Sequence, residues 1–332
     1  MTVHNEVVLA RPVTAKPGAG DFAVVERRAP NIGEREILVR VAYLSLDPYI
    51  GSRLRGKHMG EPAPAPGESL PGFCVGEVVA SRHPDFAVGD HVVGECGWSE
   101  LGVMAGDQAR KVDASLPLSA HLGVLGMPGL TAWAGVTQLA KVTAGDVFLV
   151  DAAAGAVGGT AGQIARNLGA RAIGIAGGAA KCDLVRGAYG FEACVDYKQP
   201  GWQDAVKLAC ERGPSVHFEN VGLSVLQSVM PMLRDYGRVV LCGLAEHYQV
   251  EGPPASLPIG AIIGKRAQML GLVVYDFYPR LDEWLALATP WLAEGRLTYV
   301  EDVAGGLAAA PAHFEKLMGG DNIGKSIVKV AP

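Results

Sequence analysis

Short β-like runs separated by glycine and proline turns fill roughly the first 125 residues of the chain. This pattern is typical of a twisted, barrel-like β-domain. The runs read FAVVERRAP, EILVRVAYLSL, GFCVGEVVASR and VGDHVVGECG.

The pattern changes near residue 126, where apolar strand-like runs begin to alternate with helical stretches. Strands that alternate with helices imply a parallel sheet covered on both faces. The tail adds one more helix and a final strand, and because no later helix follows, we expect this strand to return to the first domain. The pattern therefore predicts one domain over 1–125, completed by 301–332, and a second over 126–300.

Residues 153–158 read AAGAVG and lie between a predicted strand and a predicted helix. They fit A-x-G-x-x-G, a one-residue variant of the dinucleotide fingerprint. Gly155 lets the backbone approach a pyrophosphate, and Gly158 lets the helix lie close to the strand. The helix N-terminus then offers N–H groups and a partial positive charge to phosphates. Small residues also occur wherever a helix packs tightly on a sheet, but the flanking strands favour a dinucleotide.

The second strand of this region, RAIGIA, runs into Gly177 and Gly178, with Lys181 just beyond. In many dinucleotide-binding proteins an Asp or Glu here holds the ribose 2′-hydroxyl. Its absence removes repulsion toward a 2′-phosphate, and Lys181 can add a charge-assisted contact of about 1.5–3 kcal/mol. A lysine in the first turn of a helix opposes the helix dipole unless an anion compensates it. The alternative is a lysine on a solvated helix face; we predict NADPH rather than NADH.

The composition of the chain limits the kinds of molecule that it is expected to bind. The chain has 332 residues, of which 49% are hydrophobic and 19% charged, as in globular enzymes. The net charge of −5 and the lack of a basic cluster argue against nucleic acid and anionic membrane as partners. The first residues do not read as a secretory signal, and prolines and glycines interrupt the uncharged stretch 114–140. We therefore expect a cytoplasmic protein, with buried turns and a core helix in that stretch.

The six cysteines show no C-x-x-C spacing and no accompanying histidine cluster. We therefore expect neither a zinc site nor a disulfide framework, and interpret the cysteines as small buried apolar residues.

Residues 319–326, GGDNIGKS, match the P-loop pattern G-x-x-x-x-G-K-S. A P-loop needs a strand before it and a helix after it, and here the order is reversed. We predict a helix-to-strand turn, in which Asn322 offers an amide, and no ATP site.

Eight segments follow the order of a known family: LSLDPYI, MPGLTAW, AAAGAVGGTAGQIA, GIAGGAAKC, DYK, FENVG, CGLAEHYQ and DNIGKSIVKV. On these segments the chain resembles the medium-chain dehydrogenase/reductase superfamily. Within it, the chain is similar to the zinc-free branch of prostaglandin reductases, leukotriene dehydrogenases and alkenal double-bond reductases. The resemblance implies an α/β protein with a GroES-like, β-barrel-type catalytic domain and a Rossmann cofactor domain with a doubly wound parallel sheet.

The resemblance also implies a homodimeric, NADPH-dependent reductase of the C=C bond of α,β-unsaturated ketones or aldehydes. Hydride goes to the β-carbon, and the enolate is protonated at the α-carbon. The implied cofactor residues are Gly155, Ala156, Val157 and Gly158 at the pyrophosphate; Lys181 at the 2′-phosphate, with Gly178 also among the cofactor residues; Tyr197 at the 2′-phosphate or adenine; Asn220 at the ribose; and Thr131 at the carboxamide. Along the nicotinamide half they are Cys242, Gly243, Leu244, Tyr248, Leu272, Val273, Val274 and Tyr275, with Asn322 closing over that half.

The zinc enzymes of the superfamily place a Cys in the early strand and a His-Glu pair in the next segment. Here those regions read SLDPY and PGFCVG, without a His-Glu pair, and no four-cysteine lobe follows. Without a Lewis acid, alcohol oxidation loses several kcal/mol of charge stabilisation. Conjugate reduction demands less, because charge spreads into an enolate.

Tyr49, Tyr248 and the cofactor's ribose hydroxyl are the candidate donors to the enolate oxygen. Tyr49 follows the turn at Pro48, and its alternative role is packing on the domain surface. Tyr248 follows a strand's carboxyl end, where open α/β sheets bind ligands. Some relatives carry a tyrosine where this chain has Gly264, so the proton would come from water or another tyrosine, with Tyr275 and Tyr278 close by in the chain. Two alternatives stay open: a zinc-free NADPH quinone reductase and a non-catalytic NADPH-binding protein.

Overall fold

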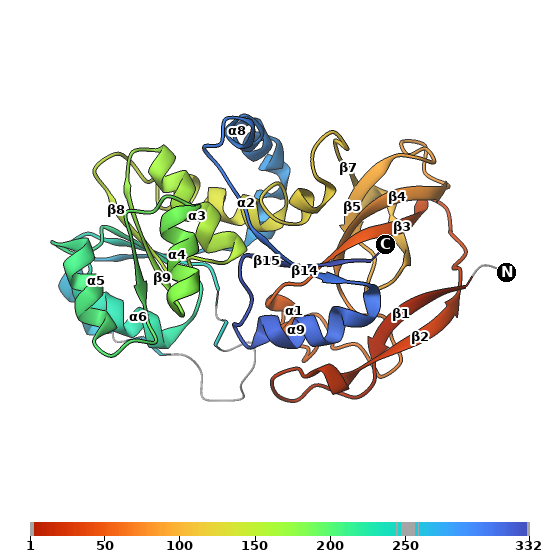
Figure 1. The fold of residues 1–332 in the computed structure, drawn as a ribbon, viewed down its shortest axis with the longest axis horizontal. Helices are drawn as coiled ribbons and strands as arrows, with labels where there is room; N and C mark the ends of the chain where they lie inside the picture. The colour runs from red at the N-terminus through yellow and green to blue at the C-terminus, as the bar shows by residue number, and fades with distance from the viewer. Residues whose placement is uncertain (1–2, 244, 247–255, 258, 331–332) are drawn as a thin grey trace. The chain divides into compact units, whose positions relative to one another are not determined.

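The computed structural model describes residues 3–243, 245–246, 256–257 and 259–330. These residues form two compact units (Figure 1). Unit 1 comprises 3–123 and 301–330, and unit 2 comprises the described residues between 124 and 300. Boundaries at 125 and 300 between independently folding domains stay a prediction.

Unit 1 is rich in antiparallel strands. Within the described residues its main sheet runs in the order β14-β15-β3-β4-β5-β7, and β6 pairs with β3. The strands β1 and β2 form a separate antiparallel hairpin. The strand bounds are β1 Val3–Leu9, β2 Phe22–Arg28, β3 Glu36–Ser45, β4 Phe73–Ser81, β5 His91–Glu95, β6 Leu101–Ala105, β7 Arg110–Lys111, β14 Glu301–Gly305 and β15 Lys325–Lys329. The last of these, β15, lies antiparallel against β3.

The main sheet of unit 1 has an irregular strand pairing. Its β3–β4 pairing shifts register twice, and such irregularities curve and twist a strand. The two strands also approach each other closely: a Cβ atom at Gly76 would lie 2.1 Å from the carbonyl oxygen of Arg40, so only glycine fits there. The predicted β-domain at the start of the chain is therefore confirmed as a sheet-rich unit.

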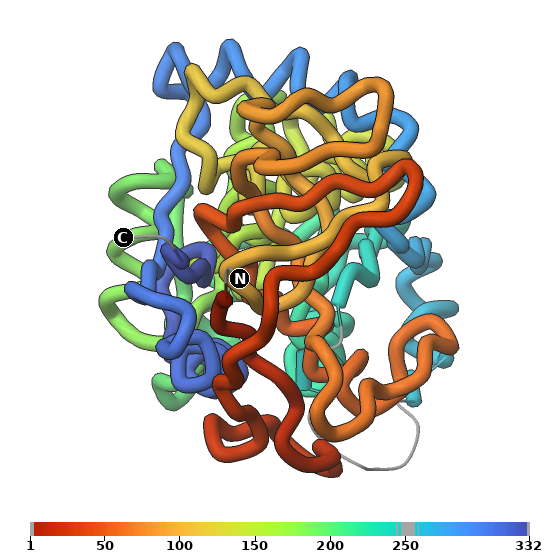
Figure 2. Tube along the Cα trace, turned by 90° about the vertical axis from the view of Figure 1, so that its right-hand side faces the viewer, coloured from red at the N-terminus to blue at the C-terminus, as the bar shows by residue number. Residues whose placement is uncertain are grey.

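The core of unit 1 brings the two ends of the chain together. Phe22 stacks on Trp98 with ring centroids 5.5 Å apart, and Trp98 meets the edge of Phe314 at 5.4 Å. Phe314 belongs to helix α9, Ala310–Met318. In Figure 2 the blue C-terminal segment lies beside the red N-terminal strands, and the Ala19 amide donates to Glu315 at 3.0 Å. Unit 1 is therefore complete only with the last 30 residues or so of the chain.

Unit 2 contains a parallel sheet. Its strand order in the described residues is β10-β9-β8-β11-β12-β13. Numbered within the unit this is 3-2-1-4-5-6, the order of the Rossmann fold. The bounds are β8 Val147–Val150, β9 Arg171–Ala176, β10 Ala193–Asp196, β11 Val216–Glu219, β12 Arg238–Leu241 and β13 Gln268–Gly271. The predicted parallel sheet is confirmed.

Helices cover both faces of this sheet, because successive strand residues point to opposite sides. Val147 and Leu149 pack against α5 and α6. On the other side, Val185 of α4 lies where Gly174 leaves room, and α3 contacts β8 and β9 (Figure 1). The helix bounds in unit 2 are α2 Met127–Trp133, α3 Ala156–Asn167, α4 Ala179–Gly187, α5 Trp202–Cys210, α6 Leu223–Val229, α7 Ile259–Lys265 and α8 Leu281–Ala293.

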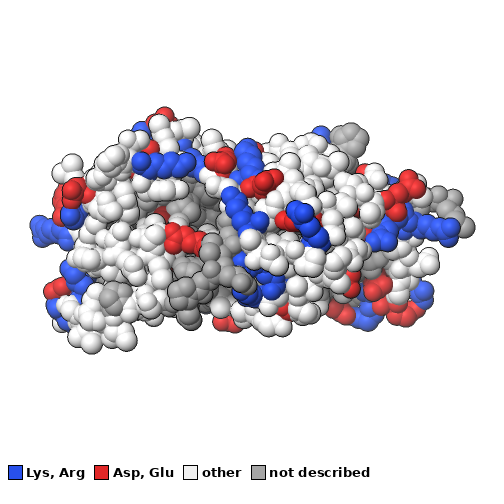
Figure 3. Space-filling view, turned by 90° about the horizontal axis from the view of Figure 1, so that it is seen from below, with Lys and Arg blue, Asp and Glu red and all other residues white. Residues whose placement is uncertain are grey.

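The uncharged stretch 114–140 folds into the short helix η3, Leu118–Leu122, then α2, then the π-helical η4, Ala134–Leu139. Most of its side chains are buried. Among the described residues, no helix has both the length and the apolar character needed to cross a membrane. Figure 3 shows acidic and basic side chains interspersed over one face of the molecule.

Candidate active site

The glycine-rich turn joins β8 to α3 at the carboxyl edge of the parallel sheet. The chain turns at Ala152, which has a positive φ of 45°, and the Gly155 amide donates to its carbonyl at 2.9 Å. A Cβ atom at Gly158 would lie 2.5 Å from that same carbonyl oxygen. Glycine is therefore required for α3 to start this close to the turn, as the sequence predicts.

The second turn, between β9 and α4, carries Lys181. Gly178 has a φ of +98°, a conformation that favours glycine, and precedes the first residue of α4. Lys181 lies in the first turn of the helix, which contains no acidic residue. The ring of Tyr197, which is 47% exposed, lies against Gly177, where a Cβ atom would approach within 2.9 Å of the ring. Tyr197 thus lies beside the turn that carries Gly178 and Lys181. Their role at a 2′-phosphate stays a prediction.

Sequence reasoning missed Asp196, the last residue of β10. Its Oδ1 accepts hydrogen bonds from the amides of Gly178 at 2.7 Å and Lys198 at 3.0 Å. These contacts, with that from Gly178 the largest cause, lower the pKa of Asp196. The carboxylate therefore fixes the shape of the Lys181 turn from a neighbouring strand. The DYK segment contains Asp196, but nothing in the sequence indicated that its carboxylate bonds the Gly178 amide.

Asn220 lies at the point where the strand order reverses, between β8 and β11. Its backbone amide donates to Asp151 Oδ1 at 2.6 Å, and its side-chain Nδ2 donates to the Asp151 carbonyl at 3.0 Å. Asn220 therefore ties the ends of the two central strands together. Its predicted place at the cofactor ribose stays a prediction.

A buried group of titratable side chains, not predicted from the sequence, lies under this edge. Asp151, His217 and Glu219 all have 0% exposure, and His217 Nε2 lies 3.2 Å from Asp151 Oδ2. Glu219 Oε1 accepts from the amides of Val221 and Gly222, while its Oε2 has no hydrogen-bond partner within the described part of the chain. The signal was present, since FLVD and VHFE each end an apolar strand with an acid.

Burial, and then the nearby Asp151, raise the pKa of Glu219 to about 9. Burial and the charge of Glu219 also raise the pKa of the Cys242 thiol. The raised pKa favours the neutral form of Glu219 near pH 7, which lowers the negative charge at this edge of the sheet.

The residues predicted for the nicotinamide half follow β12 and β13. Cys242 and Gly243 come directly after β12, whereas Leu244 and Tyr248 lie outside the described residues. The strand β13 ends at Gly271, so Val274 and Tyr275 belong to the short helix η6, Val274–Arg280, instead of extending the strand. The Tyr275 and Tyr278 rings stack with centroids 6.2 Å apart. Gly264 lies in α7, and a Cβ atom there would meet nothing within 4 Å.

Two other residues predicted to contact the cofactor form hydrogen bonds within their own segments of the chain. Thr131 lies in α2, 8% exposed, and its hydroxyl donates to the Met127 carbonyl at 2.7 Å. Asn322 lies between α9 and β15 and donates to the Gly324 carbonyl at 2.8 Å. Both roles toward a cofactor stay predictions.

Tyr49 begins the short helix α1, Tyr49–Arg53, in unit 1. Its half-buried ring packs against the core and lies 5.2 Å, centroid to centroid, from the His58 ring. Burial lowers the pKa of His58. A neutral imidazole and a phenol are therefore neighbours here, while Arg53 of the same helix bonds Glu61 and Glu95 at 2.7 and 2.6 Å.

The turn before Tyr49 is held by Lys325, the lysine of the P-loop-like segment. Lys325 Nζ donates to the Leu46 carbonyl at 2.7 Å and to Asp47 Oδ1 at 2.8 Å, and Ser45 donates to the other oxygen of Asp47. Helix α9 ends just before this segment and β15 begins within it at Lys325, so a helix precedes and a strand follows the turn, which is the predicted order. Its lysine, 5% exposed, is thus a structural cation of unit 1.

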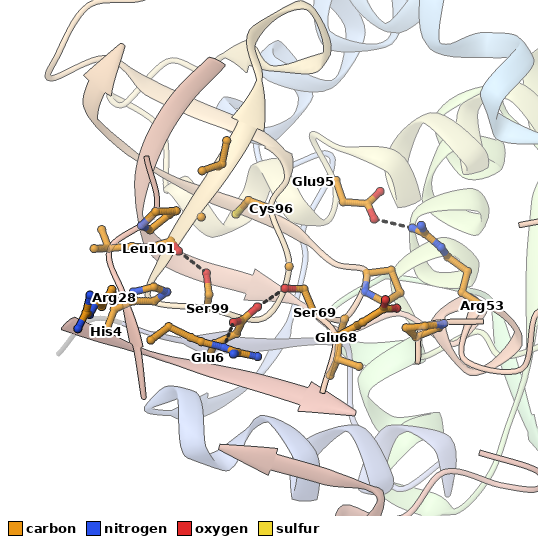
Figure 4. Close-up of a pocket in the computed structure, with 18 of the residues that line it drawn as sticks. His4, Glu6, Arg28, Arg53, Glu68, Ser69, Glu95, Cys96, Ser99 and Leu101 are labelled. Carbon is orange, nitrogen blue, oxygen red and sulfur yellow. Dashed lines mark hydrogen bonds and ion pairs between the residues drawn. The ribbon is translucent and has the colours of Figure 1, made fainter. Parts of the chain in front are cut away.

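A pocket of about 660 Å³ lies in unit 1 between the β1–β2 hairpin and the chain around Ser69 and Glu95 (Figure 4). Several charges in its wall bond one another. Glu6 accepts from Ser69 and pairs with Arg27 at 3.2 Å, and Arg53 pairs with Glu95. The pocket reaches α1 at Arg53, but Tyr49 does not line it.

Known proteins resemble this chain along almost its whole length. Residues 5–112 match a family model described as the N-terminal domain of oxidoreductase, and 156–293 match one described as zinc-binding dehydrogenase. The chain is 36% identical to the NADP(+)-dependent 2-alkenal reductase of Nicotiana tabacum, over 99% of this chain and 98% of the relative. It is also 36% identical to the NADPH-dependent curcumin reductase of Escherichia coli K12, over 98% and 96%.

The chain belongs to the zinc-free branch of the medium-chain dehydrogenase/reductase family. A solved structure of another protein, CurA from Vibrio vulnificus in complex with NADPH, superposes with a TM-score of 0.93 at 36% identity and 99% coverage of both chains. The predicted family and fold are confirmed.

This medium-chain reductase matches a model named for zinc, but its residues differ from a zinc centre. Over residues 3–243, 245–246, 256–257 and 259–330 there is no group of three or more His, Cys, Asp or Glu side chains suited to a metal ion. The acids that unit 2 does gather, Asp151 and Glu219, bond backbone amides instead.

Proposed function

We propose that this medium-chain reductase uses NADPH to reduce the C=C bond of α,β-unsaturated ketones and aldehydes. The observation that carries the proposal is its 36% identity, over 99% of its length, to a protein named as an NADP(+)-dependent 2-alkenal reductase. The E. coli curcumin reductase and the Vibrio CurA complex support the same cofactor.

The residues of unit 2 fit a phosphorylated dinucleotide. Neither α3 nor α4 has an acidic residue in its first turn or a side chain that caps it, so the positive ends of both helices favour an anion. A Cβ atom at Gly178 would meet nothing within 4 Å, which leaves open space beside the turn that carries Lys181. Both helix starts lie at the carboxyl edge of the sheet, where ligands bind in open α/β folds.

We assign the pyrophosphate to residues 155–158 and the 2′-phosphate to Lys181, with Tyr197 beside it. Asn220 and Thr131 are assigned to the ribose and the carboxamide. The remaining assignments, along the nicotinamide half, are Cys242, Gly243, Leu244, Tyr248, Leu272, Val273, Val274, Tyr275 and Asn322. Bound NADPH would supply the hydride for the β-carbon of the substrate.

The chain's own task is then to stabilise the enolate oxygen and to assist protonation of the α-carbon. We assign the first role to the Tyr49 phenol, with Tyr248 as the second candidate. Tyr49 suits the role because Lys325 and Asp47 fix the turn before it, and a preorganised donor costs little reorganisation during the reaction. The His58 ring lies beside it, and burial lowers the pKa of that imidazole.

A homodimeric assembly and a cytoplasmic location belong to the same proposal. Both rest on the family resemblance and on the composition of the chain.

Mixing the protein with NADPH and a 2-alkenal, and following nicotinamide absorbance, tests the activity directly. We expect consumption of NADPH, much slower consumption of NADH, and a saturated aldehyde as the product. Turnover of a quinone without turnover of any enone would instead identify a quinone reductase. Tight NADPH binding without turnover of either class would identify a non-catalytic binding protein.

A further inference from the structure

Two cysteines of unit 2 meet immediately behind the turn that carries Lys181. Cys182 is the residue after Lys181 in α4, and Cys194 lies in β10. Their sulfur atoms are 2.8 Å apart, with the Cys194 thiol donating to Cys182. A disulfide bond is about 2.0 Å long, so bond formation requires a closure of only about 0.8 Å.

The packing around the pair accommodates this approach. Cys194 is the register partner of Gly174 in β9, and its sulfur lies 3.4 Å from where a Cβ atom at Gly174 would be. Glycine therefore opens the space that the Cys194 side chain fills beneath α4. Cys182 is 3% exposed, whereas Cys194 is partly exposed.

We propose that Cys182 and Cys194 form a reversible disulfide when the protein meets a peroxide. Peroxide oxidises one thiolate to a sulfenic acid and is reduced to water. The second thiol then attacks that sulfur: the S–S bond forms, the S–O bond breaks and a second water molecule leaves. A small dithiol reverses the reaction by exchange.

The disulfide would connect α4 to β10 next to the proposed phosphate site. The two elements are already joined above the pair by the Gly178 amide, which donates to Asp196 Oδ1 at 2.7 Å. Drawing Cys182 toward β10 moves the first turn of α4 and with it Lys181. We infer, on the basis of the proposed function, that oxidation weakens NADPH binding at least about threefold, because a charge-assisted contact depends on the position of its donor.

We expect the reaction to be slow at neutral pH. Burial raises the pKa of both thiols, and for Cys194 the hydrogen bond to Cys182 raises it further. The positive charge of Arg186 lowers the pKa of both thiols. The negative charge of Asp196 raises the pKa of both, and that of Asp183 raises the pKa of Cys182. Since the thiolate is the reactive form, oxidation should accelerate from pH 7 to pH 8.5.

Peptide mapping of the intact, peroxide-treated protein provides the first test. Trypsin cleaves after Lys181, Arg186 and Lys198, so the two cysteines fall into peptides 182–186 and 187–198. After free thiols are blocked with N-ethylmaleimide, we expect these peptides linked, with two hydrogens fewer, and separate again after dithiothreitol. A map that shows Cys74 linked to Cys96 instead, or no linked peptides at pH 8.5, would overturn the proposal.

Fluorescence titration with NADPH, before and after oxidation, tests the coupling. Oxidised wild-type protein should bind NADPH at least about threefold more weakly, and dithiothreitol should restore the affinity. Cys182→Ser should bind equally well with and without peroxide, whereas the control Cys210→Ser, a buried cysteine on α5, should behave like wild type. Equal affinities of the reduced and oxidised wild type would overturn the coupling. A reduced protein that does not bind NADPH would refute the proposed function, while the peptide map would still decide on the disulfide.

Discussion

Lys325 donates to Asp47 over 2.8 Å and thereby joins the last strand of unit 1 to the turn that carries Tyr49. The side chains are 5% and 9% exposed. Removing one partner of a buried ion pair leaves an uncompensated charge, which costs about 3–5 kcal/mol. Two segments that lie 278 residues apart therefore depend on each other for the geometry of the candidate donor.

Lys325→Met should lower the free energy of unfolding by about 3–5 kcal/mol, measured by urea denaturation. The matched control is Lys316→Met, which removes a lysine that is 43% exposed and paired with Asp302, and which should cost less than about 1 kcal/mol. Adding Asp47→Asn to Lys325→Met should recover part of the loss, because no unpaired charge remains. Equal losses in the two single variants would contradict a structural role for Lys325.

Lys181→Ala should raise the KM for NADPH by about tenfold to a hundredfold and leave the KM for NADH nearly unchanged. The reason is that only NADPH carries the phosphate that the lysine would bind. Lys207→Ala is the control, since Lys207 lies on α5 in an exposed pair with Asp204. Steady-state kinetics with both cofactors measure the difference, and a similar rise for both would refute the phosphate assignment.

Tyr49→Phe should lower kcat for a 2-alkenal by about 10²–10³ while leaving the NADPH KM unchanged. The substitution removes the hydroxyl and keeps the ring that packs on the core, so the fold should persist. Tyr236→Phe removes the hydroxyl of an exposed tyrosine, 70% accessible, and should not change kcat. Full activity in Tyr49→Phe would transfer the donor role to Tyr248 or to the cofactor ribose.

Glu219 should make the protein less stable as the pH rises. Its pKa is about 9 in the folded protein and near 4.5 when unfolded, so between these values the folded state binds one proton more. Stability from this group is therefore fully present below about pH 4.5 and lost as the pH rises toward about 9, by up to about 1.4 kcal/mol per pH unit. Glu219→Gln, which is always neutral, should gain stability relative to wild type from pH 6 to pH 8 in urea titrations. A difference that does not change with pH would show that Glu219 is already ionised in the folded protein.

Much of the fold follows from local patterns in the sequence. The change from short β-runs to alternating strands and helices predicted both units, and AAGAVG predicted the approach of α3 to its turn, which the 2.5 Å contact at Gly158 makes obligatory for glycine. Such features depend on neighbouring residues, so the sequence shows them directly. The turn that carries Lys181 is also visible in the sequence, because its strand, glycines and lysine follow one another within a dozen residues.

The sequence was less informative about partners from other elements. The apolar run AQMLGLVV suggests a strand that continues to Val274, but pairing with β12 ends at Gly271 and Val274 begins η6. The sequence predicts that the cysteines are small buried apolar residues, and nothing in their spacing indicates that Cys182 and Cys194 are in contact. Apolar spacing predicts that a side chain is buried, yet it does not specify which other side chain lies beside it.

The sequence by itself determined the family, the order of strands and helices, and the position of the glycine and lysine turns, because each is encoded by residues close together in the chain. Only the tertiary structure decided that Asp196 braces Gly178, that Asp151 and Glu219 share one buried edge, and that Lys325 holds Asp47. These relationships arise when separate strands align in a sheet. Side-chain charge and protonation there are set by distance and desolvation, which exist only once the chain has folded.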